Sequence, residues 1–168
     1  CDIHLVDEEG KLLGRPILTA CVDAYSSLCM GYALTFHGGV QSLEDLLFNM
    51  ITDKKNWCKK FGITTEWNTT KLPGVFLTDK GKEYMSESFS QLAELGITII
   101  DLPAYRPDLK GSIEKFFDII QESYKPLLKG KGIIEKDYLK RSSHDYRLDA
   151  CITLKEFEKI ILHCIIHY

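Results

Sequence analysis

The chain has 168 residues, of which 45% are hydrophobic and 27% are charged, as expected of one folded domain with a substantial core. No apolar run is long enough to cross a bilayer, and no signal peptide is recognisable. The formal net charge of −3 is unusual for a stand-alone nucleic-acid-binding protein, which normally carries a basic excess. Six cysteines without a CxxC pair indicate reduced core thiols in a cytosolic protein.

The first part of the chain has the pattern of three antiparallel strands. Residues 3–6 and 16–23 are expected to form a β-hairpin around the turn-type segment at residues 7–10. Residues 28–36 are expected to form the third strand, after a turn at Ser26 and Ser27.

A helix is predicted next, from Ser42 to about Lys60, with a capping-type start and one continuous apolar face. Four lysines gather near its C-terminal end: Lys54, Lys55, Lys59 and Lys60. Their position complements the helix dipole, which is the simpler explanation, and contact with DNA is the alternative.

The middle of the chain alternates between strand and helix. Residues 75–78 and 97–102 are predicted to be buried strands, separated by a short helix at residues 88–95. This alternation favours parallel pairing of the two strands. Asp79 then lies where the first of them emerges, and open α/β sheets hold their ligands at that edge.

A second carboxylate, Glu114, follows a loop at residues 103–111 and begins a helix that is predicted to run to about Tyr124. Two acids from a strand end and a helix suit divalent metal ions. Taken singly, an Asp capping a turn and a Glu favouring the helix dipole would be the better explanations. Thr153 opens a last helix, at residues 154–167.

The order of elements predicts an α/β fold with a mixed sheet flanked by helices. Three segments, at residues 14–26, 77–81 and 105–117, resemble the catalytic core of DDE transposases and retroviral-type integrases, most closely the branch of TnsB and Mu transposase. The resemblance implies a ribonuclease H-like fold, with a five-stranded sheet of three antiparallel strands followed by parallel ones. It assigns residues 1–125 to the catalytic core and residues 126–168 to a C-terminal extension whose last helix packs on the core.

This resemblance implies that the chain is the core of a DNA transposase, which hydrolyses phosphodiester bonds and transfers DNA strands. Three carboxylates of such a core hold two Mg²⁺ or Mn²⁺ ions, and Asp79 matches the second acid and Glu114 the third. The first acid belongs to a strand that would precede residue 1. Asp2 is the only residue of the chain that could take its place. The expectation is that Asp2 does not do so, and that the fragment lacks a catalytic residue.

Arg106, Lys110 and Lys115 surround the expected site and are candidates for contact with DNA phosphates, although a solvated loop face would explain them too. By resemblance, the partners are transposon ends, target DNA, further copies of the chain and an accessory transposition ATPase. The expected location is the bacterial cytoplasm at the nucleoid, with no membrane partner.

Two other functions stay open, namely a nuclease of the same fold without strand transfer and a non-catalytic module for DNA or protein assembly. Asp23 and Asp101 also lie at strand ends, and are interpreted as turn or sheet-edge acids. His163 and His167 have the i, i+4 spacing of zinc ligands, but without a distant partner pair they are interpreted as helix-end histidines.

Overall fold

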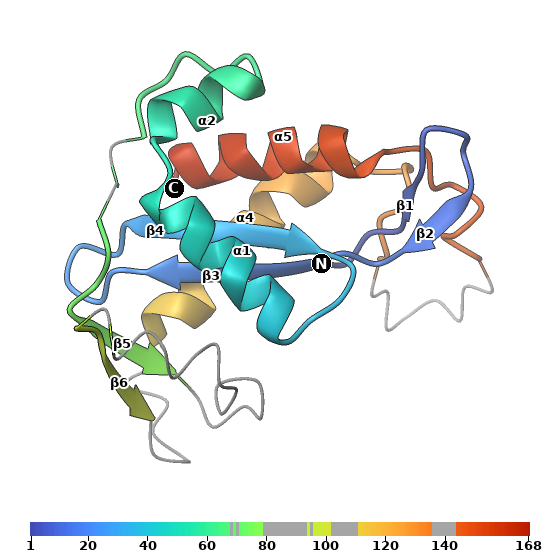
Figure 1. Cartoon of the computed structure of the whole chain (residues 1–168). Coiled ribbons are helices and arrows are strands. Elements are labelled where there is room, and N and C mark those ends of the chain that lie inside the picture. Colours follow the sequence, from blue (N-terminus) through green and yellow to red (C-terminus); the bar gives the residue numbers. More distant parts are fainter. Residues whose placement is uncertain (68, 70, 79–93, 95, 102–110, 136–143) are drawn as a thin grey trace.

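The computed structural model describes residues 1–67, 69, 71–78, 94, 96–101, 111–135 and 144–168 (Figure 1). The strands are β1 (Leu5–Val6), β2 (Leu12–Gly14), β3 (Ile17–Val22), β4 (Cys29–Thr35), β5 (Val75–Thr78) and β6 (Thr98–Asp101). The helices are α1 (Val40–Ile51), α2 (Lys54–Lys60), α4 (Gly111–Leu127) and α5 (Leu154–Ile166). None of the helices in the described ranges is both long enough and apolar enough to cross a membrane.

The six described strands form three two-stranded sheets. β1 pairs with β2 and β3 with β4, both antiparallel, whereas β5 and β6 are parallel as predicted. The prediction that both are buried is wrong, since Val75 and Leu77 of β5 and Ile100 of β6 are exposed. These strands do not show the single five-stranded sheet that was expected. Most of the predicted helix at residues 88–95 and of the loop at 103–111 lies outside the described residues.

The predicted hairpin between residues 3–6 and 16–23 is wrong. β1 pairs instead with the short strand β2, with Leu5 opposite Gly14. Gly14 has a φ of 113°, a conformation that favours glycine, and Pro16 follows two residues later. The chain therefore turns between β2 and β3, which frees β3 to pair along its whole length with β4.

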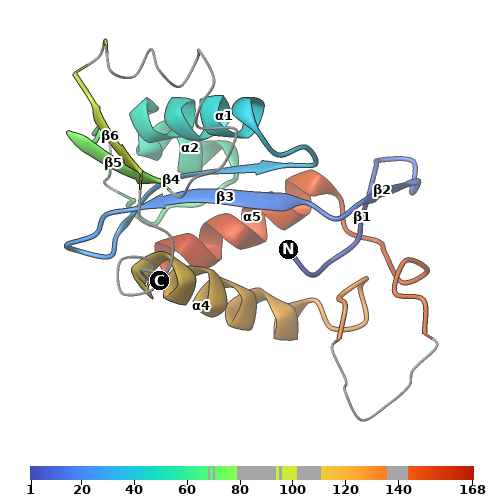
Figure 2. The same ribbon diagram turned by 90° about the horizontal axis from the view of Figure 1, so that it is seen from below.

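The β3–β4 pair lies between two layers of helices (Figure 2). Ala20 and Val22 of β3 pack in the core that α4 and α5 share, while Cys21 packs in the smaller core under α1. This alternation is the period of two that strands impose on their side chains. Phe76 and Ile97 of the β5–β6 region belong to the core under α1, so the parallel pair is fixed to the rest of the fold from that side.

The single helix predicted for residues 42–60 is two helices. α1 ends at Ile51 because Thr52 has an extended backbone, and Asp53 then caps α2 by accepting a hydrogen bond from the Lys55 backbone N–H. Ser42 does not cap α1. Its buried hydroxyl hydrogen-bonds Thr19 at 2.6 Å, so α1 begins two residues earlier.

A buried lysine closes the end of α1. Lys54 is 1% exposed, and its Nζ donates hydrogen bonds to the backbone oxygens of Asn49, Met50 and Thr52. The same ammonium lies 4.8 Å from the centre of the Trp67 ring. These contacts satisfy carbonyl groups that a helix end leaves without donors, and they join α1, α2 and the segment that follows.

The last helix begins as predicted. The Thr153 side chain accepts from the Glu156 backbone N–H, and the Glu156 carboxylate accepts from the Thr153 backbone N–H, which completes a capping box. Phe157 and Ile161 are wholly buried, while Ile160 is only half-buried. None of the six cysteines is paired in the structure; Cys29 and Cys58 are buried core thiols as expected, whereas Cys151 is exposed.

Candidate functional site

The parallel pair β5–β6 brings two strand ends to one edge. Thr78, the last residue of β5, lies opposite Asp101, and its hydroxyl donates to the Asp101 carboxylate at 3.0 Å. Thr78 is 4% exposed, so this bond fixes the end of β5 inside the fold. Asp79 is the next residue of the chain and lies outside the described residues. The described structure thus ends β5 at Thr78.

Glu114 lies in the first turn of α4, and its side chain is exposed. Phe116, Ile120 and Tyr124 occupy the buried stripe of this helix at a spacing of four residues. Glu114 precedes Phe116 by two residues, which places it on the opposite side of the helix. Within the described part of the chain, this carboxylate has no hydrogen-bond or ion-pair partner. It is therefore available to a ligand, while its position also favours the helix dipole.

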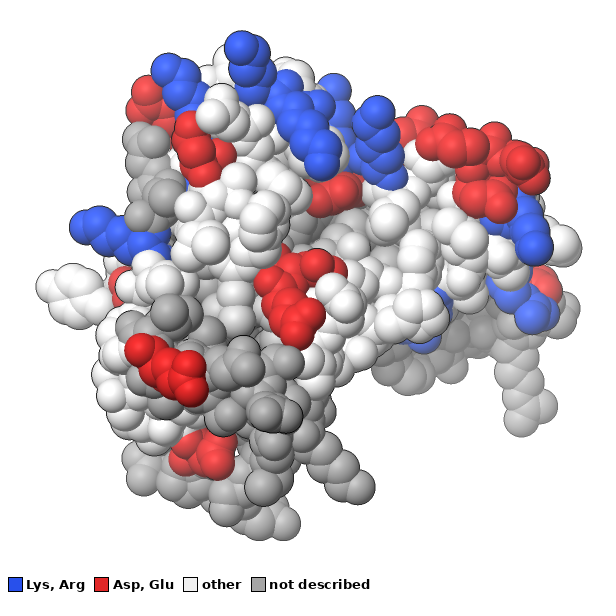
Figure 3. Space-filling model, viewed as in Figure 1, with Lys and Arg blue, Asp and Glu red and all other residues white. Residues whose placement is uncertain are grey.

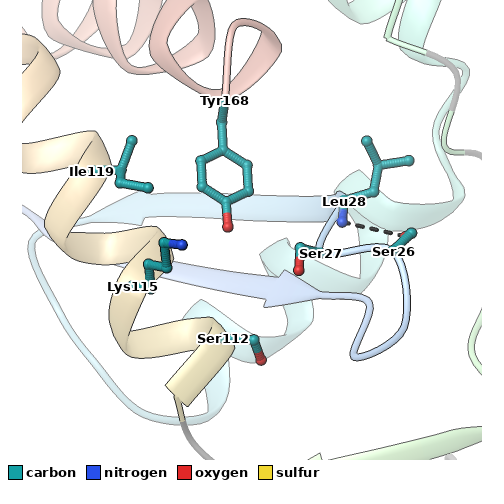
Figure 4. A pocket seen from close by; sticks show the side chains of 7 residues that line it. All are labelled: Ser26, Ser27, Leu28, Ser112, Lys115, Ile119 and Tyr168. Carbon is teal, nitrogen blue, oxygen red and sulfur yellow. Dashed lines mark hydrogen bonds between the residues drawn. The ribbon is translucent and has the colours of Figure 1, made fainter.

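Lys115 lies next to Glu114 and lines an open cavity of about 320 Å³. Figure 4 shows its amino group directed toward the Tyr168 hydroxyl, with the Ser27 hydroxyl nearby. The remaining lining residues are Ser26, Leu28, Ser112 and Ile119. A cation surrounded by hydroxyl groups suits an anionic oxygen. Arg106 and Lys110, the other two predicted DNA contacts, lie outside the described residues.

Sequence reasoning found Lys115 but missed Ser27 and Tyr168. They come from the β3–β4 turn and from the residues after α5, so only the folded chain brings them to α4. No local pattern signals this cavity. The one unusual local feature is the φ of 62° at Ser27, which turns the chain between β3 and β4.

Asp2 has a structural role at the other end of α4. Its carboxylate pairs with Arg15 at 2.7 Å and with Lys125 at 3.1 Å, and its backbone N–H donates to the Tyr124 hydroxyl. Lys125 follows Glu114 by eleven residues, which is roughly 16 Å along a helix axis. Carboxylates that hold a metal pair must reach ions only about 4 Å apart. Asp2 and Glu114 therefore cannot share such a site in this structure.

The remaining strand-end acid, Asp23, is a turn acid as interpreted. It accepts from the backbone N–H of Ser26 at 2.8 Å and from the Ser26 hydroxyl at 2.5 Å, and these bonds lower the pKa of Asp23. At the end of α5, the rings of His163 and His167 stack with centres 6.3 Å apart. Among the described residues, no three or more His, Cys, Asp or Glu side chains are grouped closely enough to hold a metal ion.

The fold of the chain is similar to that of a solved structure. Over 92% of its length, it is similar in fold to half of one chain in the cryo-EM structure of the simian T-cell lymphotropic virus intasome in complex with PP2A regulatory subunit B56 gamma. The TM-score is 0.50 and the sequence identity is 16%, so this similarity concerns the fold alone.

The sequence comparisons identify the family. Residues 1–130 match the model of the TnsB C-terminal domain, and the chain belongs to that family. It is 30% identical to the transposon Tn7 transposition protein TnsB of Escherichia coli, over 98% of this chain and 24% of that protein. It is also 30% identical to the transposase for transposon Tn552 of Staphylococcus aureus, over 77% of this chain and 25% of that protein. The chain thus spans about a quarter of the length of these relatives.

Proposed function

We propose that this chain is the catalytic core of a DNA transposase, in which Asp79 and Glu114 hold divalent metal ions that cut and join DNA strands. The observation that carries the proposal is the exposed Glu114 carboxylate in the first turn of α4, in a chain of the TnsB C-terminal domain family. The relatives named for transposition support a role in DNA transposition.

The residues fit hard metal ions in their chemistry. Glu114 offers carboxylate oxygens without a partner in the described part of the chain, and Mg²⁺ and Mn²⁺ prefer such ligands. Bound ions would supply an activated oxygen nucleophile and stabilise the leaving oxygen. In this proposal Asp79 contributes the second carboxylate from the end of β5, and the first acid of the expected three is not Asp2.

The proposed partners follow from the relatives. DNA is the substrate, both as transposon ends and as target, and further copies of the chain assemble on it as in an intasome. An accessory ATPase is part of the proposal by family resemblance. Lys115 would contact DNA phosphates from its cavity beside Glu114, together with Arg106 and Lys110.

The test is Mn²⁺ binding by the purified chain, measured by electron paramagnetic resonance. We expect Glu114→Gln and Asp79→Asn each to weaken binding at least about tenfold, because each removes a charged ligand worth more than 1.4 kcal/mol. Asp118→Asn is the matched control, since Asp118 is an exposed acid one turn further along the same helix. Equal Mn²⁺ binding by all four proteins would refute the metal site and favour a non-catalytic assembly module.

A second assay separates strand transfer from simple hydrolysis. A version of the protein that also carries the first acid expected from the family resemblance is incubated with labelled linear DNA, plasmid and Mg²⁺, and joined and cleaved products are resolved on a gel. Joined products that disappear in Glu114→Gln support a transposase. Cleaved products without joined ones would assign the nuclease function instead.

A further inference from the structure

Exposed lysines gather over α2 and α5, along the upper edge of the molecule in Figure 3. This lysine ridge consists of Lys55, Lys59 and Lys60 on α2 and Lys155 and Lys159 on α5. The two helices are about a hundred residues apart in sequence but share one core, and Lys60 of α2 is close enough to Glu158 of α5 to interact with it electrostatically.

Along α5 the exposed basic side chains recur every fourth residue. Lys155, Lys159, His163 and His167 are all exposed and follow one slowly winding stripe of the helix. The stacked rings of His163 and His167 continue the stripe to the end of the helix, and imidazole N–H groups can donate to phosphate oxygens. The histidine pair thus extends the lysine ridge along the same surface.

The helix dipole explains only part of this ridge. Lys59 and Lys60 lie in the last turn of α2, where cations are favourable. Lys55 and Lys155, in contrast, are the second residues of their helices, at the end where a cation is unfavourable. A partner of opposite charge would compensate for this cost.

The nearby carboxylates make hydrogen bonds to groups other than the lysine side chains of the ridge. Asp53 accepts from the Lys55 backbone N–H and from the Asn56 amide, Glu156 belongs to the capping box of α5, and Glu158 accepts from the Tyr32 hydroxyl. Within the described part of the chain, none of the five lysines forms an ion pair. Lys60 instead places its ammonium 4.9 Å from the centre of the Trp57 ring.

The spacing of the lysines matches a regular polyanion. Lys55 and Lys59 are four residues apart, as are Lys155 and Lys159, which is about 6 Å along a helix axis. A DNA strand carries one phosphate per roughly 3.4 Å of rise, so each pair can face about every second phosphate. We propose that the lysine ridge is a second DNA contact surface, separate from the Glu114 site, that binds the phosphate backbone of duplex DNA without sequence preference.

This inference deepens the proposed function, since it takes DNA as the ligand, but its test needs no metal. The affinity for a fluorescent duplex of random sequence is measured by anisotropy in EDTA, between about 50 and 200 mM salt. In the ridge variant, Lys55, Lys59, Lys155 and Lys159 are changed to Gln, and Lys60 is kept because it packs on Trp57. The slope of log affinity against log salt is negative, and each lost phosphate contact reduces its magnitude by about 0.9. The loss of four contacts should therefore reduce the magnitude of the slope by up to about 3.6.

The control variant carries the same change of net charge elsewhere, at the exposed residues Lys11, Lys71, Lys129 and Lys131. It should retain most of the salt dependence. Equal losses in both variants, or binding of phosphatidylserine vesicles but not of the duplex, would overturn the ridge as a DNA surface. Mn²⁺ binding by Glu114 is measured in a separate assay. The metal site and the lysine ridge can therefore be refuted independently of each other.

Discussion

Gly31 allows α1 to lie against β4, and we expect Gly31→Ala to destabilise the fold. A Cβ built on Gly31 would lie 2.5 Å from Met50 Cγ and 3.2 Å from Met50 Cα, both in α1. Met50 is wholly buried, so its side chain cannot move into solvent. The new methyl group must therefore push the helix away from the strand.

The displacement would also strain a specific hydrogen bond. The Tyr32 backbone N–H donates to Asn49 Oδ1 at 3.1 Å, and this oxygen would be 3.2 Å from the new Cβ. Overpacking of a core by one carbon typically costs about 1–3 kcal/mol. For a domain of this size, each kcal/mol shifts Tm by roughly 2–4 °C, so Tm should fall by about 2–12 °C.

The assay is thermal and urea unfolding of the wild type, Gly31→Ala and Gly74→Ala. Gly74 is exposed and its Cβ would meet nothing within 4 Å, so Gly74→Ala should leave the free energy of unfolding unchanged or slightly raised. If Gly31→Ala unfolds within about 0.5 kcal/mol of the wild type, the close approach of α1 and β4 does not limit the packing.

Two further predictions concern titratable groups, the buried Lys54 and the half-buried Glu158. Burial lowers the pKa of Lys54 to about 8. As the pH rises, the folded state therefore loses this proton before the unfolded state does. The free energy of unfolding of the wild type should then rise by up to about 3 kcal/mol between pH 8 and 10.5. Lys54→Met should lack this rise in urea titrations, and the same rise in both proteins would contradict the assignment. Burial raises the pKa of Glu158 above 4.5, so wild-type stability should decline as pH increases beyond that value. Glu158→Gln keeps an acceptor for the Tyr32 hydroxyl and should be at least as stable as the wild type at pH 8, whereas a clear loss there would show that the charge itself stabilises the fold.

Elements with strong local signals could be predicted from the sequence. The parallel strands β5 and β6 follow from two apolar runs, and the start of α5 follows from Thr153 and Glu156. The break between α1 and α2 was missed because the apolar spacing continues through both helices. Asp53 was an available signal, since it is a favourable residue for capping a new helix. The break between α1 and α2 also depends on the burial of Lys54. This burial arises from tertiary packing, which leaves no local pattern in the sequence.

Within the candidate site too, some features follow from the local sequence and others only from the tertiary structure. The strand β5, which ends at Thr78, and the first turn of α4, which carries Glu114, can both be recognised locally in the sequence. The role of Asp2 could not be recognised, because its partners Arg15 and Lys125 come from a turn and from the far end of α4.

Asp2 and Glu114 lie at opposite ends of α4, and their surroundings differ in charge. One end of the helix presents Glu114 to solvent without a partner in the described structure, and the other end holds Asp2 through Lys125. Asp2 also pairs with Arg15, so a metal ion there would have to displace two cations before it gained a single carboxylate. At the Glu114 end a metal ion displaces no ion pair of the described residues. If this chain binds a divalent ion, the difference in competing charge therefore places it at the Glu114 end of α4.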